Sequence, residues 1–452
     1  MDHEKQALYQ KIATTVRTLS IDAIEKANSG HPGLPMGCAE LGSFLFSEVL
    51  HYDPQHPLWM NRDRFILSAG HGSMLLYSLL HLSGYPISLD DLKNFRQLNS
   101  KTPGHPEFDL EIGVEATTGP LGHGIGNAVG LALSMKILAS KFNTDEHSII
   151  DNKIYCLAGD GCMMEGAASE ASSLAGHLGL NNLVLIYDQN DICLDGPTSE
   201  CFTEDVQKRY ESYGFEVLKV NGNDFNQIEE VFSQIKNDQK KPILIMAHTI
   251  IGKGSPHKQG SNSAHGSPLG EEEAKLTKKL LGQEESFFVP NEVNLFFEQK
   301  QKKMKEKYDR WKSLFEAWQK KNPELFSVWE KMRNKEMIGL EELLEEVKFP
   351  EKIAGRVASS KVIQKLAQYL PYLYSGSADL SISDKSNIEN SLIISSKDFS
   401  QRNIKFGVRE FAMGTICNGL AYSQMILPLC GTFLTFSDYM RNAIRIAAMA
   451  HL

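Results

Sequence analysis

The chain has 452 residues, 42% of them hydrophobic and 23% charged, which is typical of a globular protein with room for about three domains. A formal net charge of −9 argues against nucleic acid or an anionic membrane surface as a partner, because both attract stripes of Lys and Arg. The seven cysteines are odd in number and contain no Cys-x-x-Cys pair, so we expect reduced thiols in a cytoplasmic protein.

The N-terminal segment predicts an amphipathic packing helix that leads into a loop with a histidine. Its apolar residues recur at helical spacing, with charged residues between them: Leu8, Ile12, Val16, Leu19 and Ala23. The Asn-Ser-Gly sequence at 28–30 indicates the end of this helix, and His31 follows between glycine and proline. A loop histidine in this setting can reach a ligand.

Two further histidines occupy similar positions. Residues 64–68 predict a strand and residues 73–82 a helix, so His71 lies close to the end of a strand. His105 lies on a loop that glycine and proline frame, like that of His31. A single loop histidine is usually a solvated side chain, but three in such similar settings indicate one site.

Residues 117–127 read Thr-Thr-Gly-Pro-Leu-Gly-His-Gly-Ile-Gly-Asn and open a predicted helix that runs to residue 140. Glycine-rich backbone at the N-terminus of a helix can bind a phosphate group. The segment is not a G-x-G-x-x-G motif and no clear strand precedes it, so a Rossmann nucleotide site is a weak interpretation.

The next segment predicts a β-α-β unit with polar residues at the ends of its strands. An apolar strand at 154–158 ends in Gly-Asp-Gly, which contains Asp160, and a second apolar strand at 183–187 ends just before Asn190. Because parallel strands bind ligands at their carboxyl ends, we expect Asp160 and Asn190 to face one point. Oxygen ligands of this kind suit Mg²⁺ when phosphate oxygens supply the rest, so the pattern predicts a metal diphosphate. A plain Gly-Asp-Gly turn is the alternative, and the second strand end disfavours it.

Further strands at 215–220 and 242–248 complete the pattern of an α/β fold, with one doubly wound parallel sheet. A fourth histidine, His265, follows next to a glycine. From about residue 271 to 349 the composition changes to Lys, Glu and aromatic residues, which predicts helices. Their aromatic stripe at helical spacing indicates packing rather than a cofactor site: Met304, Tyr308, Trp311, Phe315 and Trp318.

A second α/β segment follows these helices. Residues 373–379 predict a strand and turn, and residues 426–429 predict another strand, which leads into the aromatic segment 432–439. Residues 405–410 predict a strand that runs into a helix, with Glu410 at the junction.

The Gly-Asp-Gly motif, followed after roughly thirty residues by Asn, resembles the signature of thiamine-diphosphate enzymes, and the chain as a whole is similar to the transketolase family. The resemblance covers essentially all 452 residues, whereas the family continues beyond this length. It implies a diphosphate-binding domain at 1–280, a helical linker at 281–350 and the first part of a similar, pyrimidine-binding α/β domain at 351–452. The C-terminal domain of the family would be absent from this chain.

The resemblance also implies roles for particular residues. Mg²⁺ or Ca²⁺ would be bound by Asp160, Asn190 and the carbonyl of Ile192. In one subunit, thiamine diphosphate would contact His71, Gly119, Leu121, Gly161, Asn190 and His265. From the other subunit of a homodimer it would contact Asp379, Glu410, Phe433, Phe436 and Tyr439. Sugar phosphate substrates would contact His31, His105, His265, Arg356 and Ser383, and the catalytic residues would be Glu410, His31, His71, His105 and His265.

The implied activity is the reversible transfer of a two-carbon ketol group in the pentose phosphate pathway. A ketose phosphate such as xylulose 5-phosphate would donate the group, and an aldose phosphate such as ribose 5-phosphate would accept it. Glu410 would need a buried apolar setting, where desolvation raises the pKa of a carboxyl, so that it can share a proton with the cofactor's pyrimidine nitrogen. The histidines would hydrogen-bond the sugar hydroxyls and move protons.

One residue departs from the family pattern, and three alternatives stay open. His123 stands where the family usually has Gln, and it can still donate a hydrogen bond. Dihydroxyacetone synthase has overlapping motifs and takes formaldehyde as acceptor. The chain could also be an inactive or split-subunit fragment that binds the cofactor. A metal phosphohydrolase built on Asp160 and the histidines is disfavoured, because the histidines lack the short spacings of a metal site.

Overall fold

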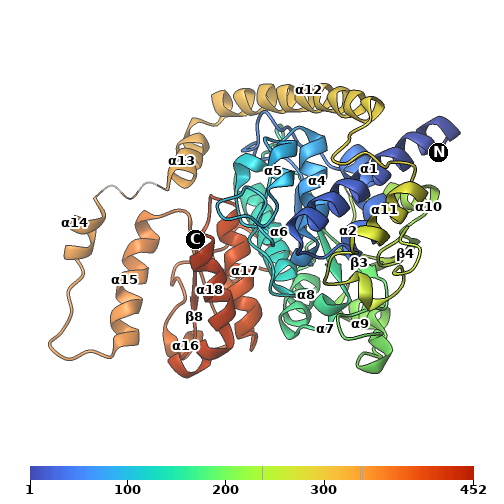
Figure 1. The fold of residues 1–452 in the computed structure, drawn as a ribbon. Coiled ribbons are helices and arrows are strands. Elements are labelled where there is room, and N and C mark those ends of the chain that lie inside the picture. The colour runs from blue at the N-terminus through green and yellow to red at the C-terminus, as the bar shows by residue number, and fades with distance from the viewer. Residues whose placement is uncertain (237, 336, 338) are drawn as a thin grey trace.

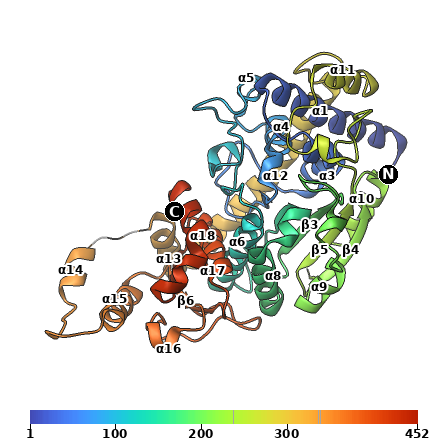
Figure 2. The same ribbon diagram turned by 60° about the horizontal axis from the view of Figure 1, so that its bottom comes forward.

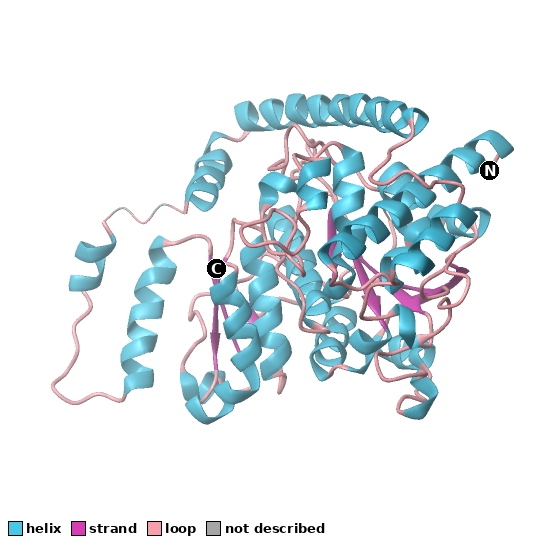
Figure 3. Ribbon diagram, in the orientation of Figure 1, coloured by secondary structure: helices cyan, strands magenta, loops and turns pink. Residues whose placement is uncertain are grey.

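The chain forms a large α/β body, a run of helices and a smaller α/β body (Figures 1 and 3). The structure is a computed structural model that describes every residue except 237, 336 and 338, and the last two of these lie within the predicted linker. The predicted fold class, two α/β segments joined by helices, is confirmed.

The large body is built on a five-stranded sheet in which all neighbouring strands are parallel. In spatial order its strands are β1 (Arg64–Leu67), β2 (Ile154–Gly159), β3 (Leu183–Gln189), β5 (Ile243–His248) and β4 (Glu216–Asn221). The first three strands are apolar and almost wholly buried, as expected for parallel strands covered on both faces. In the register, Gly159 pairs with Asp188 and Gln189 pairs with His248, so the polar strand ends meet at one edge.

Helices surround this sheet and connect its strands. They are α1 (His3–Ala27), α2 (Gly33–Gly37), α3 (Ala39–Phe44), α4 (Ser73–Ser83), α5 (Leu89–Lys93), α6 (His123–Phe142), α7 (Asp160–Met164), α8 (Gly166–Leu178), α9 (Val206–Tyr213) and α10 (Phe225–Ser233). The predicted end of the first helix is confirmed, because Asn28 caps it in the left-handed conformation with φ 47°.

The predicted helical segment is also confirmed. It contains α11 (Glu271–Leu280), α12 (Asn291–Lys321), α13 (Pro323–Asn334) and α14 (Leu340–Glu345). In Figure 1, α12 runs along the outside of the large body, and it packs against α1 and α4. Trp318 is fully buried and the Trp311 indole donates to the carbonyl of Ile149 at 2.8 Å, so the aromatic stripe serves packing, as predicted.

The smaller body has a three-stranded parallel sheet in the order β7 (Asn403–Lys405), β6 (Leu373–Ser377) and β8 (Leu427–Gly431). Its helices are α15 (Gly355–Tyr369), α16 (Ser381–Asp384), α17 (Glu410–Tyr422) and α18 (Arg441–Met449). The predicted strand at 405–410 is wrong, because the strand ends at Lys405 and Gly407 then turns the backbone with φ 68°. Glu410 begins α17, at the junction that the sequence predicts.

Helices α6 and α17 lie side by side and join the two bodies (Figures 1 and 2). A Cβ atom at Gly126 would overlap the Thr415 hydroxyl, and one at Gly130 would overlap the Ile416 carbonyl oxygen. Glycine is therefore required where the two helix backbones approach so closely. We call this contact the α6–α17 seam.

All seven cysteines have free thiols, in agreement with the expectation from the sequence. None of the helices that the structure describes is long and apolar enough to cross a membrane.

Candidate active site

The C-terminal ends of β2 and β3 place two predicted metal ligands next to each other. Asp160 follows the last residue of β2, and Asn190 follows the last residue of β3. The backbone N–H of Asn190 donates to the Asp160 carboxylate at 3.2 Å. The two residues thus meet at the same edge of the sheet.

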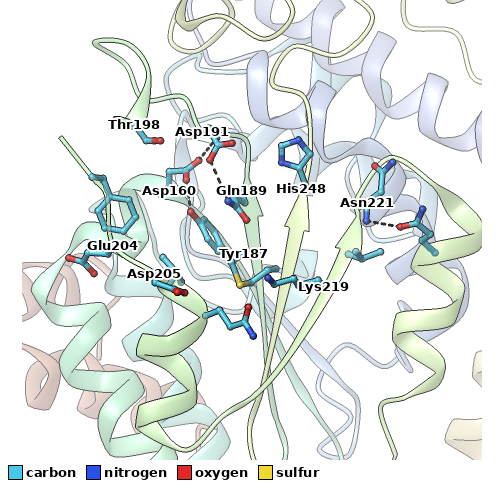
Figure 4. Close-up of a pocket in the computed structure, with 16 residues that line it drawn as sticks. Asp160, Tyr187, Gln189, Asp191, Thr198, Glu204, Asp205, Lys219, Asn221 and His248 are labelled. Atoms are coloured by element: carbon cyan, nitrogen blue, oxygen red, sulfur yellow. Dashed lines mark hydrogen bonds between the residues drawn. The ribbon is translucent and has the colours of Figure 1, made fainter. Parts of the chain in front are cut away.

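The Asp160 side chain is a buried carboxylate with three donors around it, and only 3% of its surface is exposed. The Tyr187 hydroxyl donates to Oδ1 at 2.6 Å and the backbone N–H of Asp191 donates to Oδ2 at 3.1 Å (Figure 4). The backbone N–H of Asn190 donates to Oδ2 at 3.2 Å. Burial raises the pKa of Asp160 to about 7, and the neighbouring carboxylates of Asp188 and Asp191 add to the rise. A bound dication would offset both effects, because it favours the charged carboxylate.

Both ends of the Asn190 side-chain amide have hydrogen-bond partners. Its Nδ2 donates to Asp188 Oδ2 at 2.9 Å, and its Oδ1 accepts from the backbone N–H of Ile192 at 3.1 Å. Two backbone N–H groups lie against Asp160 Oδ2, so Asn190 approaches this carboxylate through its backbone, while its amide oxygen lies on the side of the Ile192 N–H.

The oxygen atoms at this edge are nevertheless of the type that a divalent cation binds. A carboxylate, an amide oxygen and the Ile192 carbonyl lie within the turn after β2 and the loop after β3, and Mg²⁺ and Ca²⁺ prefer such oxygens. Among the described residues, no group of three or more His, Cys, Asp and Glu side chains could hold a metal ion. A cation at this edge would therefore need further oxygen ligands, which a diphosphate can supply.

Four histidines from four separate loops converge in one cluster. The ring centroids of His31 and His71 are 5.2 Å apart, and those of His71 and His265 are 5.1 Å apart with nearly parallel planes. The His31 ring is 6.2 Å from that of His105 and 6.1 Å from that of His265. The structure thus brings together the four histidines that the sequence singled out.

Burial lowers the pKa of each histidine in this cluster. The pKa of His31 falls to about 4, with contributions from the charge of Arg96 and from the other histidines, and the pKa of His71 falls well below its ordinary value. The pKa values of His105 and His265 are lowered for the same main reason. The imidazoles are therefore neutral near pH 7, and each can both donate and accept a hydrogen bond.

Two glycines expose bare backbone close to this part of the molecule. A Cβ atom at Gly161 would lie 2.8 Å from Leu121 Cδ1, and one at Gly119 would lie 3.4 Å from the His105 side chain. Gly119 also has φ 136°, which side-chain-bearing residues rarely adopt. Bare backbone N–H groups are of the kind that a diphosphate can approach closely, so these glycines fit the predicted cofactor.

Arg96 is a residue of this site that the sequence did not reveal. Its Nη1 donates to the Ser29 hydroxyl at 3.0 Å, and its Nη2 lies 3.4 Å from His31 Nδ1. In the sequence it is one arginine in a polar stretch, with no glycine or proline frame to mark it. Only the fold shows that a permanent cation borders the histidines.

The predicted residues of the smaller body lie elsewhere. Asp379, Arg356 and Ser383 are exposed, Tyr439 is 66% exposed, and the rings of Phe433 and Phe436 stack at 6.3 Å on the surface. In the part of the chain that the structure describes, no hydrogen bond, ion pair or ring contact joins them to the four histidines. Glu410 is only partly buried, so the single chain does not supply the apolar setting that its implied role needs.

The large body nevertheless fixes the start of the Glu410 helix. The Glu170 carboxylate on α8 accepts from the backbone N–H of Ala412 at 2.9 Å, and Arg409 donates to the Ser173 hydroxyl at 3.1 Å. Burial raises the pKa of Glu170, and the charge of Glu410 adds to the rise. Glu170 was not predicted, because an acidic residue on an amphipathic helix carries no distinguishing signal.

His123, the departure from the family pattern, lies at the end of the α6–α17 seam. It is 1% exposed, its ring meets Phe411 edge to face at 5.1 Å, and neither ring nitrogen has a partner among the described residues. Burial alone lowers its pKa to about 4. His123 therefore acts as a neutral packing residue at this end of the seam.

Asp160 also lines a cavity of about 530 Å³ (Figure 4). Residues at the ends of β3, β4 and β5 line it, among them Tyr187, Lys219 and His248. None of the four clustered histidines contributes to its wall. Asp160 thus borders both this cavity and the edge that carries the proposed metal ligands.

Comparison with known proteins places these features in a family. A family model described as the transketolase thiamine diphosphate binding domain matches residues 8–337, and one described as the transketolase pyrimidine binding domain matches residues 351–452. Transketolase of Halalkalibacterium halodurans is 46% identical over 447 residues, which are 98% of this chain and 67% of the relative. Transketolase of Bacillus subtilis is 47% identical over 450 residues, with the same two shares.

Solved structures agree with the sequence comparison. Transketolase from Leishmania mexicana superposes with a TM-score of 0.94 at 40% identity, over 98% of this chain and 67% of that protein. Transketolase from Pichia stipitis in complex with sedoheptulose 7-phosphate gives the same values. The chain thus spans about two thirds of the length of these relatives. It belongs to the transketolase family, and it is an enzyme of the transferase class that takes thiamine diphosphate as its cofactor.

Proposed function

We propose that the chain transfers a two-carbon ketol group between sugar phosphates, with thiamine diphosphate and Mg²⁺ or Ca²⁺ bound at the edge that carries Asp160 and Asn190. The convergence of four neutral histidines beside this edge carries the proposal. Neutral imidazoles can donate to and accept from sugar hydroxyls and can move protons at neutral pH. The Pichia stipitis relative was solved with sedoheptulose 7-phosphate, which is a ketose phosphate.

In this proposal the residues at the edge bind the cation, the diphosphate and the sugar. Asp160, Asn190 and the Ile192 carbonyl hold the cation, and the backbone at Gly119, Leu121 and Gly161 approaches the diphosphate together with His71 and His265. When bound, thiamine diphosphate supplies the nucleophilic carbon that attacks the ketose carbonyl. His31, His105 and His265 orient the sugar hydroxyls. Arg96 holds His31 in position through its contact with His31 Nδ1.

We propose that the site is completed by a second copy of the chain. The residues of the smaller body that would contact the cofactor lie at its surface: Asp379, Glu410, Phe433, Phe436 and Tyr439. Large apolar side chains exposed beside a carboxylate are typical of a surface that another protein covers. A two-fold homodimer would place this surface over the histidines of the partner and would bury Glu410.

The proposed domain boundaries are 1–280, 281–350 and 351–452. Arg356 and Ser383, which are exposed on the last of these, would bind the substrate phosphate. Seven free thiols fit a cytoplasmic enzyme of the pentose phosphate pathway.

A transfer assay with two acceptors tests the function. The protein is saturated with thiamine diphosphate and Mg²⁺, and xylulose 5-phosphate is offered with either ribose 5-phosphate or formaldehyde. We expect ketol transfer to ribose 5-phosphate. Transfer to formaldehyde alone would identify a dihydroxyacetone synthase, whereas cofactor binding without any turnover would support a binding fragment. No binding of thiamine diphosphate would contradict the proposed site.

A further inference from the structure

Asp188 is a buried carboxylate that contacts the proposed metal ligand Asn190, and it has no role in the proposed function. It is fully buried at the end of β3. The Thr249 hydroxyl, which directly follows β5, donates to its Oδ1, and the Asn190 amide donates to its Oδ2 at 2.9 Å. The buried thiol of Cys38, between α2 and α3, also hydrogen-bonds to it. Donors from three separate elements therefore hold Asp188 in one position.

The contact with Asp188 decides which way the Asn190 amide faces. An amide has an NH₂ end, which only donates, and an oxygen end, which only accepts, and a cation can bind the oxygen end alone. Asp188 already accepts from Thr249 and Cys38, and an acceptor takes the NH₂ end of Asn190. The oxygen end is left on the side of the 190–192 loop, where it now accepts from the Ile192 N–H at 3.1 Å.

We propose that Asp188 is a positioning residue that orients the Asn190 amide so that its oxygen, and not its NH₂ group, meets the metal of the cofactor. Thr249 and Cys38 support this orientation, because they fix the carboxylate that selects it. The inference rests on the proposed function only through the assignment of Asn190 as a metal ligand. Outer contacts of this kind typically change metal affinity by about 10- to 100-fold.

A double-mutant cycle tests this role through binding alone. The dissociation constant for Mg²⁺ is measured by calorimetry in the presence of saturating thiamine diphosphate. Asp188→Ala should weaken Mg²⁺ binding by about 10- to 100-fold, because the amide can then turn either end to the metal. Asn190→Asp should also weaken it, because two carboxylates would replace a 2.9 Å hydrogen bond.

The double variant Asp188→Ala/Asn190→Asp should bind Mg²⁺ more tightly than either single variant. A carboxylate has two equivalent oxygens, so position 190 no longer needs to be oriented, and the pair of like charges is gone. If Asp188 only supported the structure, the double variant would bind no better than Asp188→Ala. That result would overturn the inference.

A matched control separates orientation from charge. Gln189 lies between both residues in the sequence, but its side chain lines the cavity of about 530 Å³. Its amide lies 3.5 Å from the Asp191 carboxylate (Figure 4). Asp188→Ala/Gln189→Glu restores the lost negative charge without changing position 190, and we expect it to stay as weak as Asp188→Ala. Recovery equal to that of the Asn190→Asp double variant would show a charge effect and overturn the inference.

Two further measurements cover the remaining outcomes. If Asp188→Ala does not fold, as judged by the unfolding midpoint of the cofactor-free protein, Thr249→Val removes one donor to Asp188 and should weaken Mg²⁺ binding several-fold. Unchanged affinity in that variant would contradict the role.

If the wild-type protein shows no Mg²⁺-dependent binding of thiamine diphosphate, the proposed function fails. If it does bind and the cycle is additive, only the inference about Asp188 fails.

Discussion

The two α/β bodies carry the two halves of the proposed site, and the halves differ in how far their residues are buried and hydrogen-bonded. At the edge of the five-stranded sheet Asp160 is buried and has three donors, and the four half-buried histidines contact one another. On the smaller body the corresponding residues are exposed, with Tyr439 at 66% and Phe433 at 39%. The first half is thus formed by its own sheet, whereas the second half still needs a surface to cover it.

Between these halves the α6–α17 seam provides a rigid connection. The close packing at Gly126 and Gly130 fixes one helix against the other, and Glu170 holds the N-terminus of α17. The position of Glu410 is therefore set by the large body, although its environment is not. Substitutions in the two bodies should therefore have separable effects.

The largest effect should come from Glu410→Gln. Ketol transfer should fall by about 10²- to 10⁴-fold, because the variant cannot exchange a proton with the cofactor. Mg²⁺-dependent binding of thiamine diphosphate should stay close to wild type, because the proposed metal ligands lie on the other body. Steady-state turnover and calorimetry measure the two quantities. Glu389→Gln, an exposed acid of the same body, is the matched control and should change neither.

The shared site can be tested further by mixing subunits. Heterodimers of a Glu410→Ala subunit and an Asp160→Ala subunit should regain part of the activity, because one of the two sites would then have an intact set of residues. No recovery from verified heterodimers would argue that each chain builds its own site.

Asp160→Ala should affect the other half of the comparison. Asp160 is a proposed metal ligand, and its loss should weaken Mg²⁺-dependent cofactor binding by about 100-fold or more. Loss of a residue that only supports a metal ligand already weakens metal binding by about 10- to 100-fold. Asp195→Ala, an exposed acid in the loop that follows β3, should bind nearly as the wild type does. Fluorescence titration with Mg²⁺ at fixed thiamine diphosphate gives both constants. Equal affinities in the two variants would remove Asp160 from the metal site.

The pH dependence of stability tests the burial of His123 in the seam. The folded pKa is about 4 and the unfolded value about 6.5, so between these values the unfolded chain binds a proton that the folded chain does not. The free energy of unfolding contributed by His123 is therefore full above pH 6.5, falls as the pH drops, and levels off near pH 4. The loss should reach about 3 kcal/mol.

His123→Gln removes this contribution. Denaturant unfolding at pH 5 and pH 7.5 should show a smaller drop in the variant than in the wild type, while cofactor binding at pH 7.5 should be unchanged. The same drop in both proteins would mean that His123 does not stay neutral in the folded state. Other buried histidines such as His31 contribute equally to both proteins and cancel in the comparison.

The smallest effect should come from Gly130→Ala in the seam. A Cβ atom there would overlap the Ile416 carbonyl oxygen, and overpacking of this kind typically costs about 1–3 kcal/mol. Gly166→Ala, at the start of α8, is the control, because a Cβ atom there would meet nothing within 4 Å. Thermal unfolding compares the two. A larger loss for Gly166→Ala would contradict the description of the seam.

Local patterns in the sequence were enough to place several of the main elements. Apolar periodicity placed α1, the five strands of the large sheet and the packing stripe of α12, because these patterns depend on residues only a few positions apart. It also placed Asp160 at a strand end and marked four histidines by their flanking glycines and prolines. The one wrong strand, at 405–410, failed at Gly407, whose positive φ the apolar pattern does not reveal.

Which of these residues meet depends on the packing of separate elements. Thr249 reaches Asp188 across 61 positions because β5, and not β4, lies beside β3, and no local pattern encodes that order. Arg96 beside His31, Glu170 under α17 and the burial of His123 likewise depend on how separate elements pack. A residue's type and immediate neighbours set its chemistry, but its partners are fixed by strand order and helix contacts, which minimise the free energy of the whole chain.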